Sequence, residues 1–182
     1  MLINQLNPLP YQKGVGMVEV LVAILLLAIG VLGFSVLQVR AVEATGEGFN
    51  RSQAIIILRG LAESIRVNSN GQTSYPTAVA NYTAMTSAPT SPTVRCTASS
   101  PCQPADLAKL DSFQAALAAY NIRMNINMLA CPGVPASVAN PRQCLFAAWG
   151  STTPTLGANT TDCMTTAGAY APQATCVMME AY

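Results

Sequence analysis

The sequence contains no histidine, and this absence excludes several kinds of catalytic site at once. Ser-His-Asp and Cys-His triads, His-ligated zinc sites and the commonest general base all need that residue. The six cysteines include no C-x-x-C pair, which favours disulfides over a zinc site. We therefore expect no catalytic residue, no metal and no cofactor.

Charged residues are also scarce, at 9% of the 182 residues, against about a quarter in ordinary soluble domains. The formal net charge is +1, and beyond Val67 four basic residues stand against four acidic ones, so no basic stripe is available for nucleic acid. Asp106 and Asp111 are five residues apart and would lie on different faces of a helix, which makes them a poor acid/base pair. The composition predicts a protein that is not an enzyme and does not bind nucleic acid.

A run of twenty uncharged residues, from Val20 to Val39, lies between Glu19 and Arg40. As a helix it would be about 30 Å long, which is the thickness of a bilayer core. A cleavable secretory signal has a shorter apolar core of about 7–15 residues and a small-residue cleavage site. We therefore expect a transmembrane helix that remains in the mature protein. The alternative is a fully buried helix of a soluble protein.

All six cysteines come after this run. Disulfides persist mainly in oxidising compartments such as the bacterial periplasm, so we expect the C-terminal part outside the cytoplasm. Six cysteines allow fifteen connectivities, among which sequence alone does not choose. Pairing of neighbours is favoured because each pair closes a short loop, and a loop of about 15 residues contributes about 3 kcal/mol in the chain-entropy model. The favoured pairs are Cys96 with Cys102, Cys131 with Cys144, and Cys163 with Cys176.

The residues just before the apolar run resemble a processing signal. Lys13-Gly14-Val15-Gly16-Met17-Val18-Glu19, followed by the run, resembles the class III signal of type IV prepilins, in which a prepilin peptidase cuts after the glycine and methylates the new N-terminus. The resemblance implies cleavage between Gly14 and Val15, N-methylation of Val15 and a subunit-docking role for Glu19, the fifth mature residue. Val15 departs from the family's usual phenylalanine or methionine. The span also lacks the proline of the major pilins, which argues against a major subunit.

Glu19 lies at the edge of the apolar run, where a charge is costly unless it is paired. Cleavage would free the amine of Val15 about one helical turn away, and neighbouring subunits could then pair the two charges. The alternative is that Glu19 only favours the helix start or reaches the lipid headgroups.

Two stretches are most similar to minor pilins of the PilV type, residues 17–33 and residues 102–111. This resemblance implies a minor pilin that helps to prime pilus assembly within a minor-pilin tip complex. Its partners would be prepilin peptidase, other minor pilins, the major pilin, the inner-membrane assembly platform, a tip adhesin and inner-membrane lipid. It would cross the bacterial inner membrane once, with its head in the periplasm, and then enter the pilus. The alternatives are a minor pseudopilin of a type II secretion system and an adhesive or DNA-receptor pilin.

No proline occurs between Met17 and Val67, and the first strong breaker cluster is Asn68-Ser-Asn-Gly71, so one helix is predicted over Met17 to Val67. Its second half is amphipathic, with Ile55, Leu58, Ala62 and Ile65 on the apolar face. Such a face needs a cover, which the rest of the chain most simply provides.

Beyond this helix, residues 72–103 are rich in Ser, Thr, Pro and Ala and are expected to form a loop with at most short ordered pieces. A short helix is predicted from Pro104 to Tyr120. Alternation over residues 122–128 predicts a strand, and the apolar runs 144–149 and 176–182 are its expected companions in an antiparallel sheet. The apolar positions expected in the helix are Leu107, Leu110, Ala115, Leu117 and Ala118, and those expected in the core of the sheet are Met124, Ile126, Met128 and Trp149.

The predicted fold is α+β and type IV pilin-like. A long N-terminal helix, transmembrane and then amphipathic, packs on a C-terminal antiparallel sheet head with disulfides. We expect a leader over residues 1–14, the helix over 15–67 with its span at 20–39, and a periplasmic head over 68–182.

Overall fold

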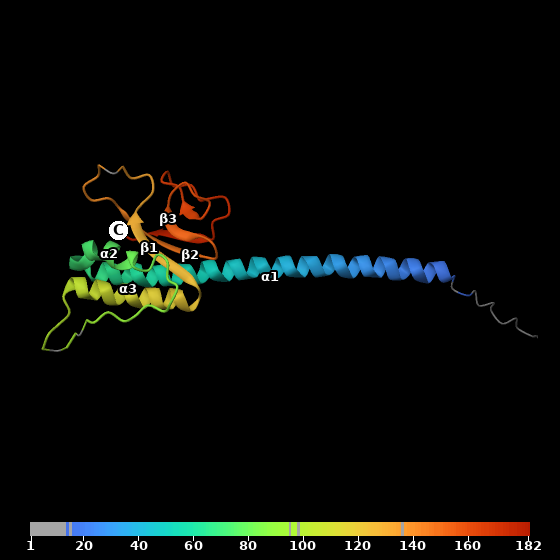
Figure 1. Ribbon diagram of the computed structural model, residues 1–182, viewed down its shortest axis with the longest axis horizontal. Coiled ribbons are helices and arrows are strands. Elements are labelled where there is room, and N and C mark those ends of the chain that lie inside the picture. Colours follow the sequence, from blue (N-terminus) through green and yellow to red (C-terminus); the bar gives the residue numbers. More distant parts are fainter. Residues whose placement is uncertain (1–13, 15, 95, 98, 136) are drawn as a thin grey trace, which may run out of the picture. The chain divides into compact units, whose positions relative to one another are not determined.

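The computed structural model describes residues 14, 16–94, 96–97, 99–135 and 137–182. The chain forms two compact units, which divide between Thr45 and Gly46. One helix, α1 (Met17–Val67), contributes to both units (Figure 1). The helix predicted from Met17 to Val67 is therefore confirmed. In the first unit, every described residue up to Thr45 is exposed.

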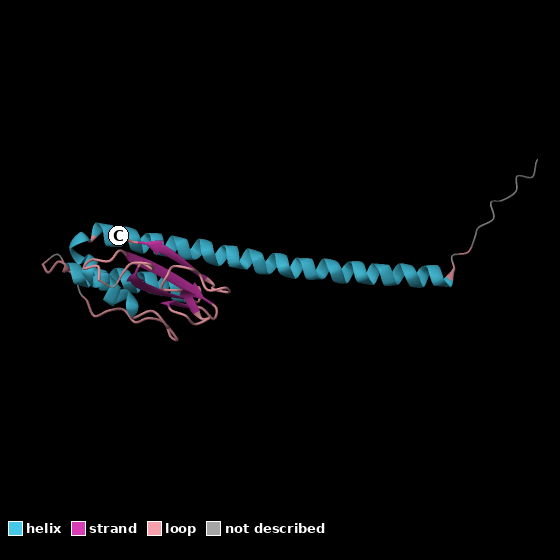
Figure 2. Ribbon diagram, turned by 90° about the horizontal axis from the view of Figure 1, so that it is seen from above, coloured by secondary structure: helices cyan, strands magenta, loops and turns pink. Residues whose placement is uncertain are grey.

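The second unit contains a three-stranded antiparallel sheet with β2 in the centre. Its strands are β1 (Met124–Ala130), β2 (Gln143–Trp149) and β5 (Cys176–Glu180), and they lie beside the helices in Figure 2. The register places Met124 opposite Trp149 and Cys144 opposite Glu180. Two short strands that were not predicted, β3 (Thr153–Leu156) and β4 (Asp162–Met164), form a small parallel pair.

The first strand of the sheet begins two residues later than predicted. Ile122 is the C-cap of α3 (Pro104–Asn121), and Arg123 has a φ of 59°, so the chain makes a left-handed turn before β1 begins at Met124. A non-glycine residue in this region is uncommon, and the apolar alternation gave no sign of it. The predicted loop over residues 72–103 contains the end of a 3₁₀ turn, η1 (Ser69–Ser74), and a short helix, α2 (Tyr75–Ala80).

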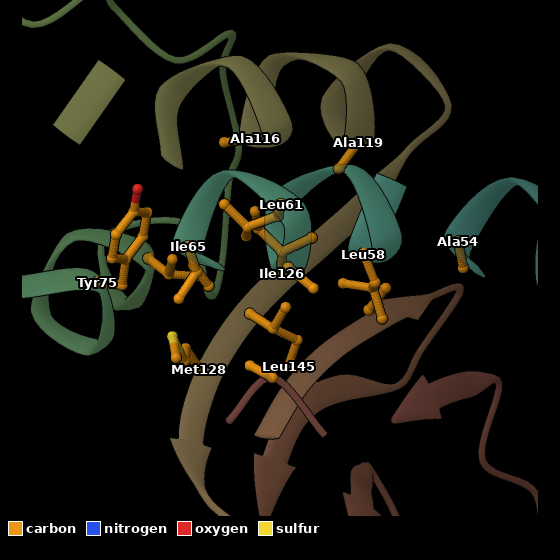
Figure 3. Close-up of a cluster of buried hydrophobic side chains, with 14 of the residues drawn as sticks. Ala54, Leu58, Leu61, Ile65, Tyr75, Ala116, Ala119, Ile126, Met128 and Leu145 are labelled. Atoms are coloured by element: carbon orange, nitrogen blue, oxygen red, sulfur yellow. The ribbon is translucent and has the colours of Figure 1, made fainter. Parts of the chain in front are cut away.

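The main core of the second unit forms around one face of α1. In Figure 3, α1 lies between α3 and the strands, with Leu58 and Ile65 toward the sheet residues Ile126 and Leu145. Ile55 was predicted on this face but is 37% exposed. The preceding residue, Ala54, is buried in the core instead. The α1 residues that are buried are Ala54, Leu58, Leu61, Ala62 and Ile65. The predicted sheet core of Met124, Ile126, Met128 and Trp149 is confirmed.

The buried face of α3 consists of small side chains rather than the predicted larger ones. Leu107 is 38% exposed, and none of Leu110, Ala115, Leu117 and Ala118 is buried. Two helices that pack closely leave space only for small groups at their contact, so tight packing explains this face. The buried residues of α3 are Ala108, Ser112, Ala116 and Ala119.

The second face of the sheet belongs to a smaller buried cluster that is rich in cysteine. Along β2, Leu145, Ala147 and Trp149 belong to the main core, whereas Cys144, Phe146 and Ala148 belong to a second cluster. This cluster contains two disulfides, Cys131–Cys144 and Cys163–Cys176, and all four of these cysteines are buried. The third pair is Cys96–Cys102, so the structure has the same three pairs as the sequence favoured.

Substitutions at two nearby residues of α1 test the packing of this helix in the main core. Leu58 is fully buried in the core, and Ile56 is 60% exposed. Replacement of a fully buried leucine by alanine typically costs about 2–5 kcal/mol, and a surface change costs less than about 0.5 kcal/mol. We expect Leu58→Ala to lower the free energy of unfolding by about 2–5 kcal/mol. Ile56→Ala should lower it by less than about 0.5 kcal/mol. Urea unfolding of the full chain in detergent, followed by the fluorescence of its single tryptophan, measures both. Equal losses in the two variants would contradict this packing.

Candidate functional site

The junction before α1 is exposed in the part that the structure describes. Gly14 and Gly16 are exposed, and α1 begins at Met17. The carbonyl of Gly16 accepts hydrogen bonds from the backbone N–H groups of Glu19, at 2.9 Å, and Val20, at 3.3 Å. Most of the predicted leader and the predicted methylation site, Val15, lie outside the described residues.

Glu19 stands in the first turn of α1, at the edge of the charge-free run. Its carboxylate is exposed and borders a shallow surface hollow with four apolar neighbours of the same helix, which are Val20, Ala23, Ile24 and Leu27. Within the described residues, Glu19 has no salt bridge and its side chain makes no hydrogen bond. A carboxylate at this end favours the helix dipole. It is also the one acid in the first unit without a cationic partner among the described residues, since Glu43 pairs with Arg40 at 3.2 Å.

Six other charged residues of α1 form ion pairs along the helix, and one of them, Glu47, also joins the helix to the sheet. Glu47 accepts a hydrogen bond from Nε of Arg51 at 2.9 Å through one oxygen and from the indole N–H of Trp149 at 3.0 Å through the other. Both bonds are assisted by the carboxylate charge. The bond from Trp149 joins the end of β2 to the part of α1 that lies in the second unit, and the bond from Arg51 holds the Glu47 carboxylate in place. No sequence pattern pointed to this contact, because its partners are 102 positions apart.

Asp111 belongs to a structural hydrogen-bond group rather than to an acid/base pair. The hydroxyl of the buried Tyr75 donates to Asp111 at 2.5 Å, and the amide of Asn68 donates to the Tyr75 hydroxyl at 3.2 Å and to the carbonyl of Pro104 at 2.7 Å. Burial raises the pKa of Tyr75 well above its usual value, and the hydrogen bond to Asp111 raises it further. The phenol therefore remains a neutral donor that holds α2 to α3. Asp106 instead pairs with Lys109 at 2.9 Å.

The loop closed by Cys163–Cys176 is held at its start by Asp162. The Asp162 side chain is buried and accepts hydrogen bonds from the hydroxyl of Thr155, at 2.6 Å, and from the backbone N–H of Asn159, at 2.9 Å. These two bonds, the Thr155 bond foremost, lower the pKa of Asp162. Gly157 allows the close approach, since a Cβ atom there would collide with the Asp162 carboxylate. Asp162 thus ties β3 to β4.

Two family models match the chain. Residues 36–113 match a family described as Tt1218-like, type IV pilin Tt1218, and residues 9–35 match the prokaryotic N-terminal methylation motif. No significant match was found among curated proteins or among solved structures. The two matched stretches adjoin, and together they contain the predicted processing site and all of α1.

The chain has a type IV pilin-like fold. The long N-terminal apolar helix, the antiparallel sheet and the disulfides of the C-terminal region confirm the predicted fold class. The motif match implies processing by a prepilin peptidase and assembly with other pilins. Type IV pilins are structural proteins, and α1 is long and apolar enough to cross a membrane, so anchoring in a membrane and localisation to a pilus are indicated.

The predicted site residues fall into two groups in this pilin-like chain. Gly14 lies just before α1 and Glu19 lies in its first turn, whereas the six cysteines lie in the second unit, so the structure does not gather them into one pocket. Among the described residues, no cluster of three or more acidic or cysteine side chains is arranged to hold a metal. The hydrogen bonds of Glu47 and Asp162 were not predicted from the sequence, because they depend on tertiary contacts.

Asp162 gives the second unit a predictable response to acid. Folding lowers the pKa of Asp162 below its ordinary value of 3.8. The ionised carboxylate therefore stabilises the fold at a pH above 3.8, and this stabilisation is lost as the pH falls through the pKa of the folded state. We expect Asp162→Asn to be less stable than the unsubstituted chain at pH 7, with a difference that narrows below about pH 4. Thermal unfolding at several pH values, with Trp149 fluorescence as the probe, measures this. Asp106→Asn, which removes an exposed ion pair worth less than about 1 kcal/mol, is the control. A difference that is independent of pH would contradict the assignment.

Proposed function

We propose that this chain is a minor pilin of the PilV type that helps to prime pilus assembly within a minor-pilin tip complex. Prepilin peptidase would cut between Gly14 and Val15 and methylate Val15, and the mature helix would then pack with other subunits. The observation that carries this proposal is the single carboxylate of Glu19, at the start of an otherwise uncharged run and in register with Gly14 and the matched methylation motif.

The chemistry of the junction explains why the two charges would be paired between subunits. Cleavage creates an amine at Val15, four residues before Glu19, and both groups would lie where the apolar span begins. Each charge is costly to bury alone, and a pair is tolerated when its geometry and hydrogen bonds are good. An amine of one subunit that meets Glu19 of the next would fix the axial position of adjacent helices.

The cysteines support a head outside the cytoplasm. Two of the three disulfides are buried in the cluster that covers one face of the sheet, so this part of the fold needs an oxidising compartment to form. We therefore propose a single pass through the bacterial inner membrane, with residues 68–182 in the periplasm as the head. The leader would be residues 1–14 and the mature helix residues 15–67.

The sequence of the helix favours a minor pilin over a major pilin. The mature part of α1 lacks the proline that the resemblance associates with the major pilins. Partners would then be other minor pilins, the major pilin, the assembly platform, a tip adhesin and membrane lipid. A minor pseudopilin of a type II secretion system shares the same processing and anchor, and would be recognised by co-purification with secretion rather than pilus components.

The pairing role of Glu19 is testable by substitution. Removal of one partner from a buried ion pair costs about 3–5 kcal/mol, and each 1.4 kcal/mol is a factor of ten in an equilibrium constant. We expect Glu19→Ala to reduce co-purification of the chain with the other pilins at least about tenfold. Glu19→Gln, which keeps the shape and loses the charge, should show a similar loss.

The matched control is Glu43→Ala, on the same helix. Glu43 makes only an exposed pair with Arg40, so this variant should co-purify normally. Normal incorporation of Glu19→Ala, at equal membrane levels of both variants, would disprove the pairing role.

A further inference from the structure

The segment from Thr86 to Thr93 has no part in the function proposed above. Its sequence is Thr-Ser-Ala-Pro-Thr-Ser-Pro-Thr, so five of its eight residues carry a hydroxyl and two are proline. It contains neither a charged nor an aromatic residue. Segments rich in Ser, Thr and Pro are typical of O-glycosylated stalks.

The backbone of this segment is open to an incoming enzyme. Residues 86–93 belong to neither a helix nor a strand. Within the part of the chain that the structure describes, no hydrogen bond involves their backbone or side-chain atoms. Proline fixes φ near the polyproline II value, so Pro89 and Pro92 favour an extended chain. An enzyme could therefore bind the segment without first breaking secondary structure.

The prolines and the hydroxyls differ in exposure. Pro89 and Pro92 are partly buried, and they are three residues apart, which is one turn of a polyproline II helix. Pro92 also lines a surface hollow together with Thr77 and Tyr82. All five hydroxyl residues of the segment are exposed, and these are Thr86, Ser87, Thr90, Ser91 and Thr93. The prolines thus rest against the fold and leave the hydroxyls accessible.

Several other polar groups that resemble acceptors already make hydrogen bonds. Thr153 and Thr155 share a hydrogen bond of 2.8 Å, and Thr97 and Ser99 share one of 3.1 Å. Asn81, in the N-linked acceptor pattern Asn-Tyr-Thr, donates its amide to the carbonyls of Thr77 and Ala78, at 3.3 Å each. Residues 86–93, by contrast, place five exposed hydroxyl residues within eight positions, and none of the five makes a hydrogen bond to another described residue.

We propose that residues 86–93 are an acceptor site for O-linked sugar. The Oγ of a threonine or serine would attack the anomeric carbon of a sugar donor activated as a phosphate or diphosphate ester. The glycosidic C–O bond forms as the bond to the phosphate breaks, the phosphate leaves, and the hydroxyl proton passes to a base of the transferase. This proposal does not depend on the pilus role of the chain.

Peptide mass spectrometry of the full chain, purified from the cells that make it, tests the proposal. Trypsin cuts after Arg66 and Arg95 and releases one peptide that contains the whole segment. We expect this peptide to carry added saccharide mass, to yield sugar fragment ions and to lose them on β-elimination. Fragmentation that preserves side-chain modifications should place the sugar between Thr86 and Thr93.

A pair of variants completes the test. Replacement of all five hydroxyl residues by alanine should return the peptide to its unmodified mass. Ser69→Ala with Thr73→Ala, two exposed positions on the same peptide, should leave the modification unchanged. Trp149 fluorescence checks that both variants fold. An unmodified peptide from the unsubstituted chain, or a sugar located on Asn81 or elsewhere, would overturn the proposal.

Discussion

A single helix has to satisfy two different environments, and the rest of the structure depends on this constraint. Over Met17 to Thr45, α1 exposes every side chain, and no charge interrupts residues 20–39. Over Gly46 to Val67, the same helix buries one face, which includes Leu58 and Ile65, in the main core. The first half therefore needs lipid or other apolar helices as its surroundings, whereas the second half needs the sheet and α3. A pilin-like subunit requires both properties in one element.

The sheet is covered on both faces, but by different means. The helix covers the face of Leu145 and Ala147, and the disulfides Cys131–Cys144 and Cys163–Cys176 help to cover the face of Phe146. A second helical layer would need many more residues, whereas cross-links stabilise a small, loop-rich unit by restricting the unfolded chain. This use of cysteine agrees with our proposal that the head folds outside the cytoplasm. It also explains why β2 is apolar along almost its whole length rather than alternating.

Local patterns predicted the long helix, α3, the central sheet and the disulfide pairs, because each depends on neighbouring residues or short loops. They failed where tertiary contacts decide. The buried face of α3 consists of Ala108, Ser112, Ala116 and Ala119, a choice set by close packing that the positions of leucine did not reveal. The strands β3 and β4 are short and rely on Asp162, and the left-handed turn at Arg123 delays β1. At the candidate site, spacing singled out Gly14 and Glu19, whose roles in cleavage and docking stay predictions. The bond between Glu47 and Trp149 had no local pattern.

We propose that processing at Gly14 and Val15 prepares the helix for docking through Glu19. Intact-mass spectrometry of the chain, recovered from membranes of cells with and without prepilin peptidase, tests it most directly. We expect a peptidase-dependent loss of residues 1–14 together with one added methyl group on Val15. An unprocessed N-terminus in both strains would contradict it and would leave a membrane-anchored protein without the amine that Glu19 is proposed to pair.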